Sequence, residues 1–304
     1  MDKSIIKNLL VPLDGSLLAE SVLTVASELA KKINVSITLI HMIESDPPKT
    51  IHGQRHLTNP EQAEQYLNSI AKSKLFEGIT AHIHVHDISV KNVSQSISEH
   101  SKELHQDLVI MCTHGSGGLH DLLFGSIAQQ VISLGNIPVL LINPTQNKIN
   151  THEKFDTFLI PLDGNPEHEH VLEYSVILAK MCNAKIHLLM AIPHFGTMSG
   201  KLTAANRLLP GTTSKMLDMI VSDAEEYLAG IQKKLEASEL KVSVSSSRND
   251  PAAAIADIAK KINADMIILG THGKKGAEAF WEGSVTPKIS KSSKIPLLLV
   301  PVRG

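Results

Sequence analysis

The chain has 304 residues, a formal net charge of −2 and an aromatic content of only 3%. This near-neutral charge gives no electrostatic basis for binding nucleic acid or an anionic membrane, and so few aromatic residues leave little surface for stacking bases. No apolar run reaches the roughly 18 residues of a membrane span, the N-terminus does not resemble a signal peptide, and two cysteines do not make a disulfide framework. We therefore expect a cytoplasmic protein with no nucleic-acid or membrane partner.

Apolar runs alternate with helical periodicity throughout the chain. In the first half, strands are expected at 5–13, 35–43, 79–88, 107–112 and 138–142, and helices at 17–33, 61–76, 90–104 and 125–134. In the second half, strands are expected at 155–162, 185–192, 240–246, 265–269 and 295–300, and helices at 168–181, 214–235, 251–262 and 283–290. The stretch 143–153 is polar and predicts a linker, and 193–213 is irregular. This alternation predicts an α/β fold with doubly wound parallel sheets.

The second half repeats the motifs of the first. The run Leu-Val-Pro-Leu-Asp-Gly at 10–15 returns as Leu-Ile-Pro-Leu-Asp-Gly at 159–164, which is 149 residues later. Thr-His-Gly and Ile-Pro recur 158 residues apart, at 113–115 and 271–273, and at 137–138 and 295–296. A repeat of this length indicates one duplicated domain, and we expect domains at 1–146 and 154–304.

Each half carries a glycine-punctuated loop after its fourth predicted strand. In the second half the loop is Gly270-Thr271-His272-Gly273, and nine residues separate Gly273 from Gly283-Ser284. The backbone N–H groups of such a loop, and of the helix that follows it, can hold phosphate. The first half repeats the spacing from Gly115 to Gly125-Ser126. The two serines have an alternative role as plain helix N-caps.

An aspartate followed by glycine ends the first predicted strand of each half. Asp14 and Asp163 both follow Pro-Leu at the carboxyl end of that strand, which is the edge where parallel sheets bind ligands. Their carboxylates could accept hydrogen bonds from a ribose or an adenine amino group. The alternative is a turn-forming aspartate, because Asp-Gly is a common turn pair.

The combination of this aspartate, Gly-x-x-Gly, nine residues and Gly-Ser resembles the universal stress protein family. The match covers essentially the whole chain, twice, as in a tandem two-domain member. The resemblance implies two five-stranded, Rossmann-like parallel sheets of order 3-2-1-4-5, with the domains paired through their fifth strands. It also implies binding of ATP or AMP, together with Mg²⁺.

The resemblance places the nucleotide site residue by residue. In the first half it implies an adenosine pocket and a ribose-phosphate site formed by Pro12, Asp14, Met42, Met111, Gly115, Gly125, Ser126 and Ile127. The matching residues of the second half are Pro161, Asp163, Ala191, Leu269, Gly270, Gly273, Gly283, Ser284 and Val285. Cys112 replaces the first glycine of the motif, so we expect the second half to be the better site. Phe280 and Trp281, inside the second nine-residue gap, count against it.

Other polar residues have a functional and an ordinary interpretation. His82, His84 and His86 alternate along one predicted strand and could share a metal ion, but a polar face on an edge strand is the preferred explanation, and we assign no metal site. His168 and His170 predict a solvated turn before a helix. Cys112 is either a reactive thiol or a small buried side chain.

The sequence therefore predicts a stress-response or signalling protein that binds adenine nucleotide. No motif supplies a catalytic base, so we expect little or no turnover and at most slow ATP hydrolysis. The alternative is an interaction scaffold with two degenerate, nucleotide-free pockets. Adenylate-forming enzymes of this sheet type need motifs that are missing after the first strand. We expect the halves to pair within the chain near Pro138 and Pro296, and a further homodimer stays open.

Overall fold

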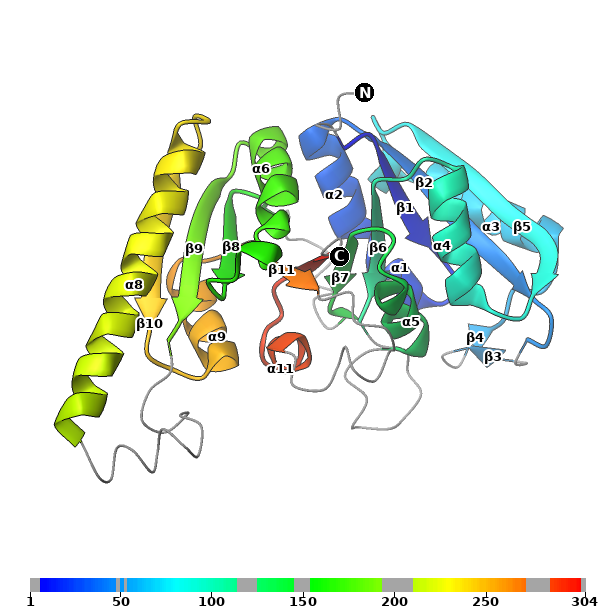
Figure 1. Cartoon of the computed structure of the whole chain (residues 1–304). Coiled ribbons are helices and arrows are strands. Elements are labelled where there is room, and N and C mark those ends of the chain that lie inside the picture. The colour runs from blue at the N-terminus through cyan, green and yellow to red at the C-terminus, as the bar shows by residue number, and fades with distance from the viewer. Residues whose placement is uncertain are drawn as a thin grey trace.

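The computed structural model describes residues 6–47, 50–51, 54–113, 125–144, 154–192, 210–271 and 285–301 (Figure 1). The strands of the first half are β1 (Asn8–Pro12), β2 (Ser36–Glu44), β3 (Thr50–Ile51), β4 (Gln54–Arg55), β5 (Ala81–Val90), β6 (Leu108–Cys112) and β7 (Val139–Ile142). Its helices are α1 (Leu17–Glu20), α2 (Leu23–Ile33), α3 (Pro60–Ala71), the short 3₁₀ helix η1 (Lys74–Phe76), α4 (Val93–Glu103) and α5 (Ser126–Leu134).

The second half repeats this order of strands and helices. Its strands are β8 (Thr157–Leu162), β9 (Lys185–Ala191), β10 (Val242–Ser247), β11 (Met266–Thr271) and β12 (Leu297–Pro301). Its helices are the 3₁₀ helix η3 (Pro166–His168), α6 (His170–Cys182), α8 (Pro210–Glu236), α9 (Pro251–Lys261) and α11 (Val285–Ser292). None of the helices that the structure describes is long and apolar enough to cross a membrane.

All the long strands belong to one ten-stranded sheet. Its order is β10-β9-β8-β11-β12-β7-β6-β1-β2-β5, so each half has the predicted order 3-2-1-4-5. Neighbours within each half are parallel, whereas β7 and β12 are antiparallel and place Leu140 opposite Leu298. The predicted fold class and the contact through the fifth strands are confirmed. The outermost strands, β5 and β10, lie at opposite ends of the molecule in Figure 1.

Helices cover both faces of the sheet, which makes three layers. One core cluster lies under α1, α2, α3, α6 and α8, and a second lies under α4, α5, α9 and α11. The two clusters share the central strands because successive strand residues point to opposite faces. Leu9 packs into the first cluster and Leu10 into the second, and both are fully buried.

Local capping chemistry explains where several helices begin and end. Asn59 accepts hydrogen bonds from the first turn of α3, where Pro60 has no N–H group that would need an acceptor. Asp250 does the same before α9. Helices α2 and α6 both end at an asparagine in the left-handed conformation, Asn34 and Asn183, each with φ of 54°. These two asparagines are 149 residues apart, so the duplication reaches the helix ends.

Some predicted boundaries were wrong. The helix expected at 17–33 is two helices, because Ser16 caps α1 through its hydroxyl and the chain turns at Ser21. Val90 belongs to β5, and α4 begins only after Asn92, whose side chain accepts a hydrogen bond from Gln95 N–H. Helix α8 begins at Pro210, inside the segment expected to be irregular, while residues 193–209 lie outside the described ranges.

Polar contacts join the two halves beside the β7–β12 pair. The Tyr174 hydroxyl on α6 donates a hydrogen bond to the Asp107 carbonyl oxygen at 3.2 Å. The Lys32 ammonium on α2 lies 3.0 Å from the Asp156 carboxylate. Both sides of this ion pair are substantially exposed, so it contributes little stability. The antiparallel strand pair is therefore the main connection between the halves.

Candidate functional site

In the first half, the expected site lies where the strand order reverses. β1 and β6 are neighbours, and the chain leaves them on opposite sides, toward β2 and toward β7. Ligands bind at the carboxyl ends of such strand pairs. Asp14 follows β1 and Thr113 follows β6. Gly125 N–H, at the start of α5, donates to the Thr113 carbonyl oxygen at 2.7 Å, which holds the helix N-terminus against the end of β6.

Asp14 is half-buried and folds the chain back at this edge. One carboxylate oxygen accepts hydrogen bonds from Ser16 N–H at 2.9 Å and from the Ser16 hydroxyl at 2.6 Å. The predicted turn role is therefore present. Gly15 has φ of +86°, and a Cβ atom built there would lie 2.8 Å from Leu57. Only glycine fits this backbone position, which explains the Asp-Gly pair.

Three predicted apolar residues of the first half lie on one face of the sheet, toward its carboxyl edge. Met42 on β2 is buried, and Met111 on β6 and Ile127 on α5 pack against the same core cluster. Pro12 lies partly exposed at the end of β1. Ser126 is exposed and occupies the first helical position, after Gly125 as the N-cap. The plain N-cap interpretation of Ser126 was therefore wrong.

The second half differs at its aspartate. Asp163 is exposed and accepts hydrogen bonds from Asn165 N–H at 3.0 Å and from His168 Nδ1 at 2.6 Å. The His168 side chain is only 18% exposed, so the solvated-turn interpretation of this histidine was wrong, whereas His170 is half exposed at the start of α6. Nothing in the sequence spacing distinguishes the two, because only the 3₁₀ turn of η3 brings His168 back to Asp163.

The apolar part of the second site matches the first. Ala191 on β9, Leu269 on β11 and Val285 on α11 pack in the same core cluster, on the same face of the sheet. Pro161 and Gly270 are partly exposed at the ends of β8 and β11.

In the first half, Cys112 stands at the position of Gly270, and its side chain lies on the other face of the sheet from this apolar surface. Cys112 packs against the core cluster on the opposite face. The thiol is half-buried.

The glycine loops themselves fall outside the described residues. Of the residues discussed from the sequence, this applies to His114, Gly115, His272, Gly273, Phe280, Trp281, Gly283 and Ser284. The described part of each site therefore consists of the strand ends, the aspartate, the apolar residues and the start of the following helix.

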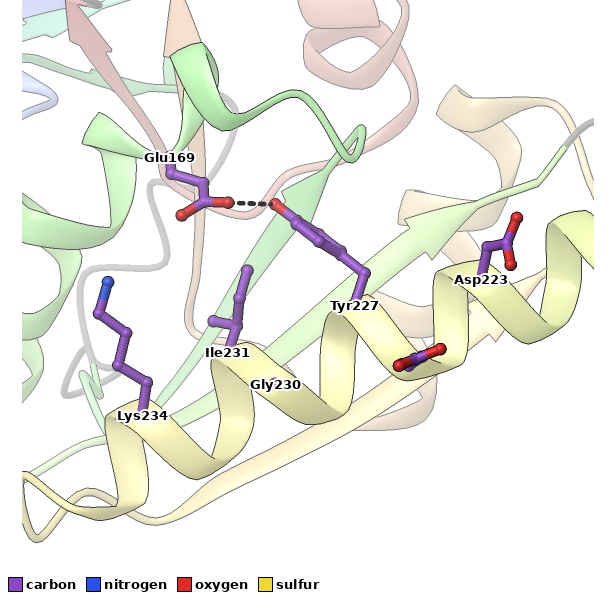
Figure 2. A pocket seen from close by; sticks show the side chains of 7 residues that line it. Glu169, Asp223, Tyr227, Gly230, Ile231 and Lys234 are labelled. Carbon is purple, nitrogen blue, oxygen red and sulfur yellow. Dashed lines mark hydrogen bonds between the residues drawn. The ribbon is translucent and has the colours of Figure 1, made fainter.

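An open pocket of about 490 Å³ lies elsewhere, between the start of α6 and α8 (Figure 2). Its rim carries the carboxylates of Glu169, Asp223 and Glu226 against one cation, Lys234, which disfavours phosphate. The Tyr227 hydroxyl donates to Glu169 at 3.1 Å, as the dashed line shows. Burial, and then the neighbouring glutamate, raise the pKa of this phenol.

The first half contains the same tyrosine–glutamate contact. The Tyr66 hydroxyl donates to Glu20 at 3.0 Å, and burial raises the pKa of this phenol too. A contact that recurs in both halves is explained by helix packing. We therefore assign no ligand to the pocket of Figure 2.

The structure also changes the histidine set that the sequence suggested. His84 and His86 lie close to His100 on α4, whereas His82 is exposed and lies outside this group. Sequence reasoning missed His100 because it sits on the following helix. The only available signal was its position on the buried face of that helix.

Comparisons with known proteins agree with this architecture. The model of the universal stress protein family matches residues 6–143 and 154–301. The chain is similar to the universal stress protein E homolog of Haemophilus influenzae, with 23% identity over 87% of this chain and 82% of that protein. It is 24% identical to universal stress protein MJ0531 of Methanocaldococcus jannaschii, over 50% of this chain and 85% of the relative.

A solved structure supports the fold over the full length. The crystal structure of a universal stress protein from Archaeoglobus fulgidus superposes with a TM-score of 0.69, covering 97% of this chain and 96% of that one. The two sequences are 19% identical, so this likeness concerns the fold alone.

Proposed function

Because the chain belongs to the universal stress protein family, with two copies of the family domain, we propose that it is a cytoplasmic adenine-nucleotide-binding protein of stress response or signalling. It would hold ATP or AMP with little or no turnover. One observation carries this proposal. In each half, an aspartate, an apolar surface from three elements and a helix start converge on the carboxyl edge of the sheet, where the strand order reverses.

Each part of the first site suits one part of an adenine nucleotide. The apolar surface of Met42, Met111 and Ile127 suits the adenine ring. The Asp14 carboxylate is an acceptor for ribose hydroxyls. The first N–H groups of α5 have no partner within the helix and lie at the positive end of its dipole, so they suit a phosphate group. The exposed hydroxyl of Ser126 lies beside them. Mg²⁺ would neutralise the remaining phosphate charge.

We infer that the second half binds more tightly. Gly270 lets the backbone come close to a ligand at the position where the first half has Cys112. The two halves also differ in the residue beside the aspartate, because the position of His168 is Ala19 in the first half, 149 residues earlier. The His168 imidazole stands at this strand edge, with Nδ1 bound to Asp163 and Nε2 3.4 Å from the Asn165 side-chain amide.

Slow or absent hydrolysis follows from the groups that the site offers. The site offers a carboxylate that is turned toward its own loop, backbone N–H groups and a serine hydroxyl, and these groups can hold a nucleotide in place. Phosphoryl transfer also needs a group that orients the attacking water and a cation that stabilises the transition state. No sequence motif supplies these groups.

The deciding experiment is a calorimetric titration of ATP and AMP, with Mg²⁺, into the wild type and three variants. Gly115→Val and Gly273→Val each place a branched side chain in one of the two phosphate loops. Gly211→Val is the matched control, because Gly211 lies exposed on α8 with open space around its Cβ position. We expect Gly273→Val to abolish most of the binding and Gly211→Val to leave it unchanged.

Other outcomes would change the proposal in defined ways. Loss of binding only with Gly115→Val would mean that Cys112 is tolerated and that the first half is the working site. No heat and no thermal shift at millimolar ATP would contradict nucleotide binding and leave the interaction scaffold. Release of phosphate at several turnovers per second would contradict the absence of efficient turnover.

A further inference from the structure

Three histidines meet where edge strand β5 passes alongside helix α4. His84, His86 and His100 each offer one ring nitrogen, and these three atoms lie within 4.8 Å of one another. The ring centroid of His100 lies 5.0 Å from that of His84 and 4.6 Å from that of His86. The two strand histidines share a face because strand residues alternate, and the helix supplies the third ring from above that face.

We propose that His84, His86 and His100 form a binding site for a divalent transition-metal ion, with Zn²⁺ as the ion that fits best. Imidazole is a ligand for zinc, copper and nickel rather than for Mg²⁺ or Ca²⁺. Nitrogen ligands in a tetrahedral zinc site lie about 3.3 Å apart, given Zn–N bonds of about 2.0–2.1 Å. Small rotations of the three rings bring them to this distance and leave a fourth position for water or a carboxylate.

The hydrogen bonds of His100 leave its outer nitrogen available to a metal. Nδ1 lies 2.9 Å from the Ser96 carbonyl oxygen, so it carries the proton and donates it. Nε2 then carries the lone pair, and it lies 3.9 Å from the Glu103 carboxylate. A backbone carbonyl that fixes the tautomer of a histidine is the usual support for a metal-binding imidazole.

His84 has a polar atom that needs a partner. Its Nε2 is buried and has no hydrogen-bond partner among the residues that the structure describes. Such a nitrogen costs free energy unless a ligand satisfies it.

The surroundings favour a cation and admit it from solvent. The histidines line an open groove of about 450 Å³. Its charged residues besides the histidines are Asp87, Glu99, Glu103 and Lys91, which gives three carboxylates against one ammonium group. The negative excess attracts a divalent ion, and Glu103, which is 67% exposed, can move to take the fourth position.

The second half shows that the fold does not need these histidines. Strand pairing places His84 opposite Ile40 and His86 opposite Met42, and the duplicated strands place Ser245 opposite Leu189 and Ser247 opposite Ala191. Both strand positions therefore hold serine in the second half.

The helix position differs in the same way. Ile258 stands 158 residues after His100 and packs against the core. All three histidines are thus specific to the first half, where they meet at one point.

The test is a zinc titration of the full-length, tag-free protein, freed of metal with a chelator and kept without nucleotide. We expect one Zn²⁺ per chain, no competition from Mg²⁺, and at least a tenfold loss of zinc affinity in the double variant His84→Ser/His86→Ser. This variant carries the serines of the second half. His82→Ser is the control, because His82 is an exposed histidine of the same strand outside the cluster. It should bind zinc as the wild type does.

Two further measurements make the test independent of how well the double variant folds. Co²⁺ should give the visible absorption of a four-coordinate site in the wild type and lose it in His100→Ile. Anomalous diffraction at the zinc edge from wild-type crystals should place the ion between the three rings. The proposal is overturned if the double variant keeps wild-type affinity, if His82→Ser loses as much, or if the anomalous peak lies elsewhere.

Discussion

Asp107 and Asp265 hold the start of the first strand in their own half of the molecule. The Asp107 carboxylate accepts hydrogen bonds from the N–H groups of Lys7 and Asn8 at 2.8 and 3.0 Å. Asp265 does the same for Asp156 and Thr157, both at 2.9 Å. Each aspartate directly precedes β6 or β11, so it sets the alignment of the two strands whose far ends carry the candidate site.

Replacing Asp265 with alanine should destabilise the second half. The change leaves two backbone N–H groups without their charged acceptor, and hydrogen bonds to charged groups contribute about 1.5–3 kcal/mol. We expect the free energy of unfolding to fall by about 2 kcal/mol, seen as a lower urea midpoint. Asp257→Ala, at an exposed position on α9, is the control. Equal midpoints for the two variants would show that the strand contact is unimportant.

His187 should make the stability of the second half depend on pH. Its ring nitrogens lie 2.8 Å from the hydroxyls of Ser243 and Ser245. Burial lowers the pKa of His187, and Lys261 adds to this effect. The unfolded chain therefore takes up a proton at a higher pH than the folded chain, and stability falls as the pH drops below about 6.5. Above that pH both forms are neutral and the effect vanishes.

The measurement is the urea midpoint of wild type and His187→Gln at pH 7 and pH 5. The variant should lose less stability on acidification than the wild type. His170→Gln is the matched control, because His170 is half exposed at the start of α6. An acid-induced loss that is the same in wild type and His187→Gln would contradict the assignment.

At the level of elements, the pairing of β7 with β12 decides how the halves join. Leu140 and Leu298 lie opposite each other in the antiparallel pair and are fully buried in the same core cluster. An antiparallel edge contact satisfies the backbone groups of both edge strands and removes two exposed edges at once. In each half the fifth strand is the edge strand of the half's own sheet. After duplication, the two fifth strands can therefore bury each other.

A charge in this strand pair should separate or destabilise the halves. Leu298→Asp buries a carboxylate without a partner opposite Leu140, and we expect a loss of about 3–5 kcal/mol. The readouts are the urea midpoint and the radius of gyration. Met219→Asp, on the exposed side of α8, controls for the added charge. If Leu298→Asp leaves stability and size unchanged, the contact between the halves lies elsewhere.

On the scale of the whole molecule, the two halves are copies that have diverged at their junction and at their sites. Tyr174 of the second half and Lys32 of the first half each contact the other half of the molecule. The residue equivalent to Tyr174 is Val25 and the residue equivalent to Lys32 is Met181, so neither contact is repeated by the duplicated position. The histidine cluster belongs to one half only. Divergence of this kind lets two sites on one scaffold take different ligands.

The halves should stay together after the chain is cut between them. We expect a protease site introduced between residues 144 and 154 to leave both fragments in one peak on size exclusion. The strand pair and its core hold them without the linker. Adding Leu298→Asp should split the peak, whereas adding Tyr174→Phe should not, because it removes a single neutral hydrogen bond. Separation of the unmodified fragments would mean that the linker holds the pair.

Hydrophobic periodicity and the repeat were enough to predict most of the fold. Buried strands such as β2 are apolar runs, and helices end at asparagine or begin after Asn-Pro, so both signals are local. The aspartates could be placed because they follow the first strand of each half directly, whereas the apolar site residues were placed by the family resemblance. Boundaries failed where a side chain capped the backbone, as Ser16 and Asn92 do.

The sequence by itself thus determined two α/β domains, and its resemblance to the universal stress protein family supplied their strand order and their contact through the fifth strands. Only the tertiary structure decided which remote side chains meet. His100 joins His84 and His86 because α4 packs over β2, the strand next to β5, and His168 reaches Asp163 because the chain turns back at η3. Periodicity reports which face of an element is buried. It carries no information on which element covers that face, and that choice follows from the packing of the whole sheet.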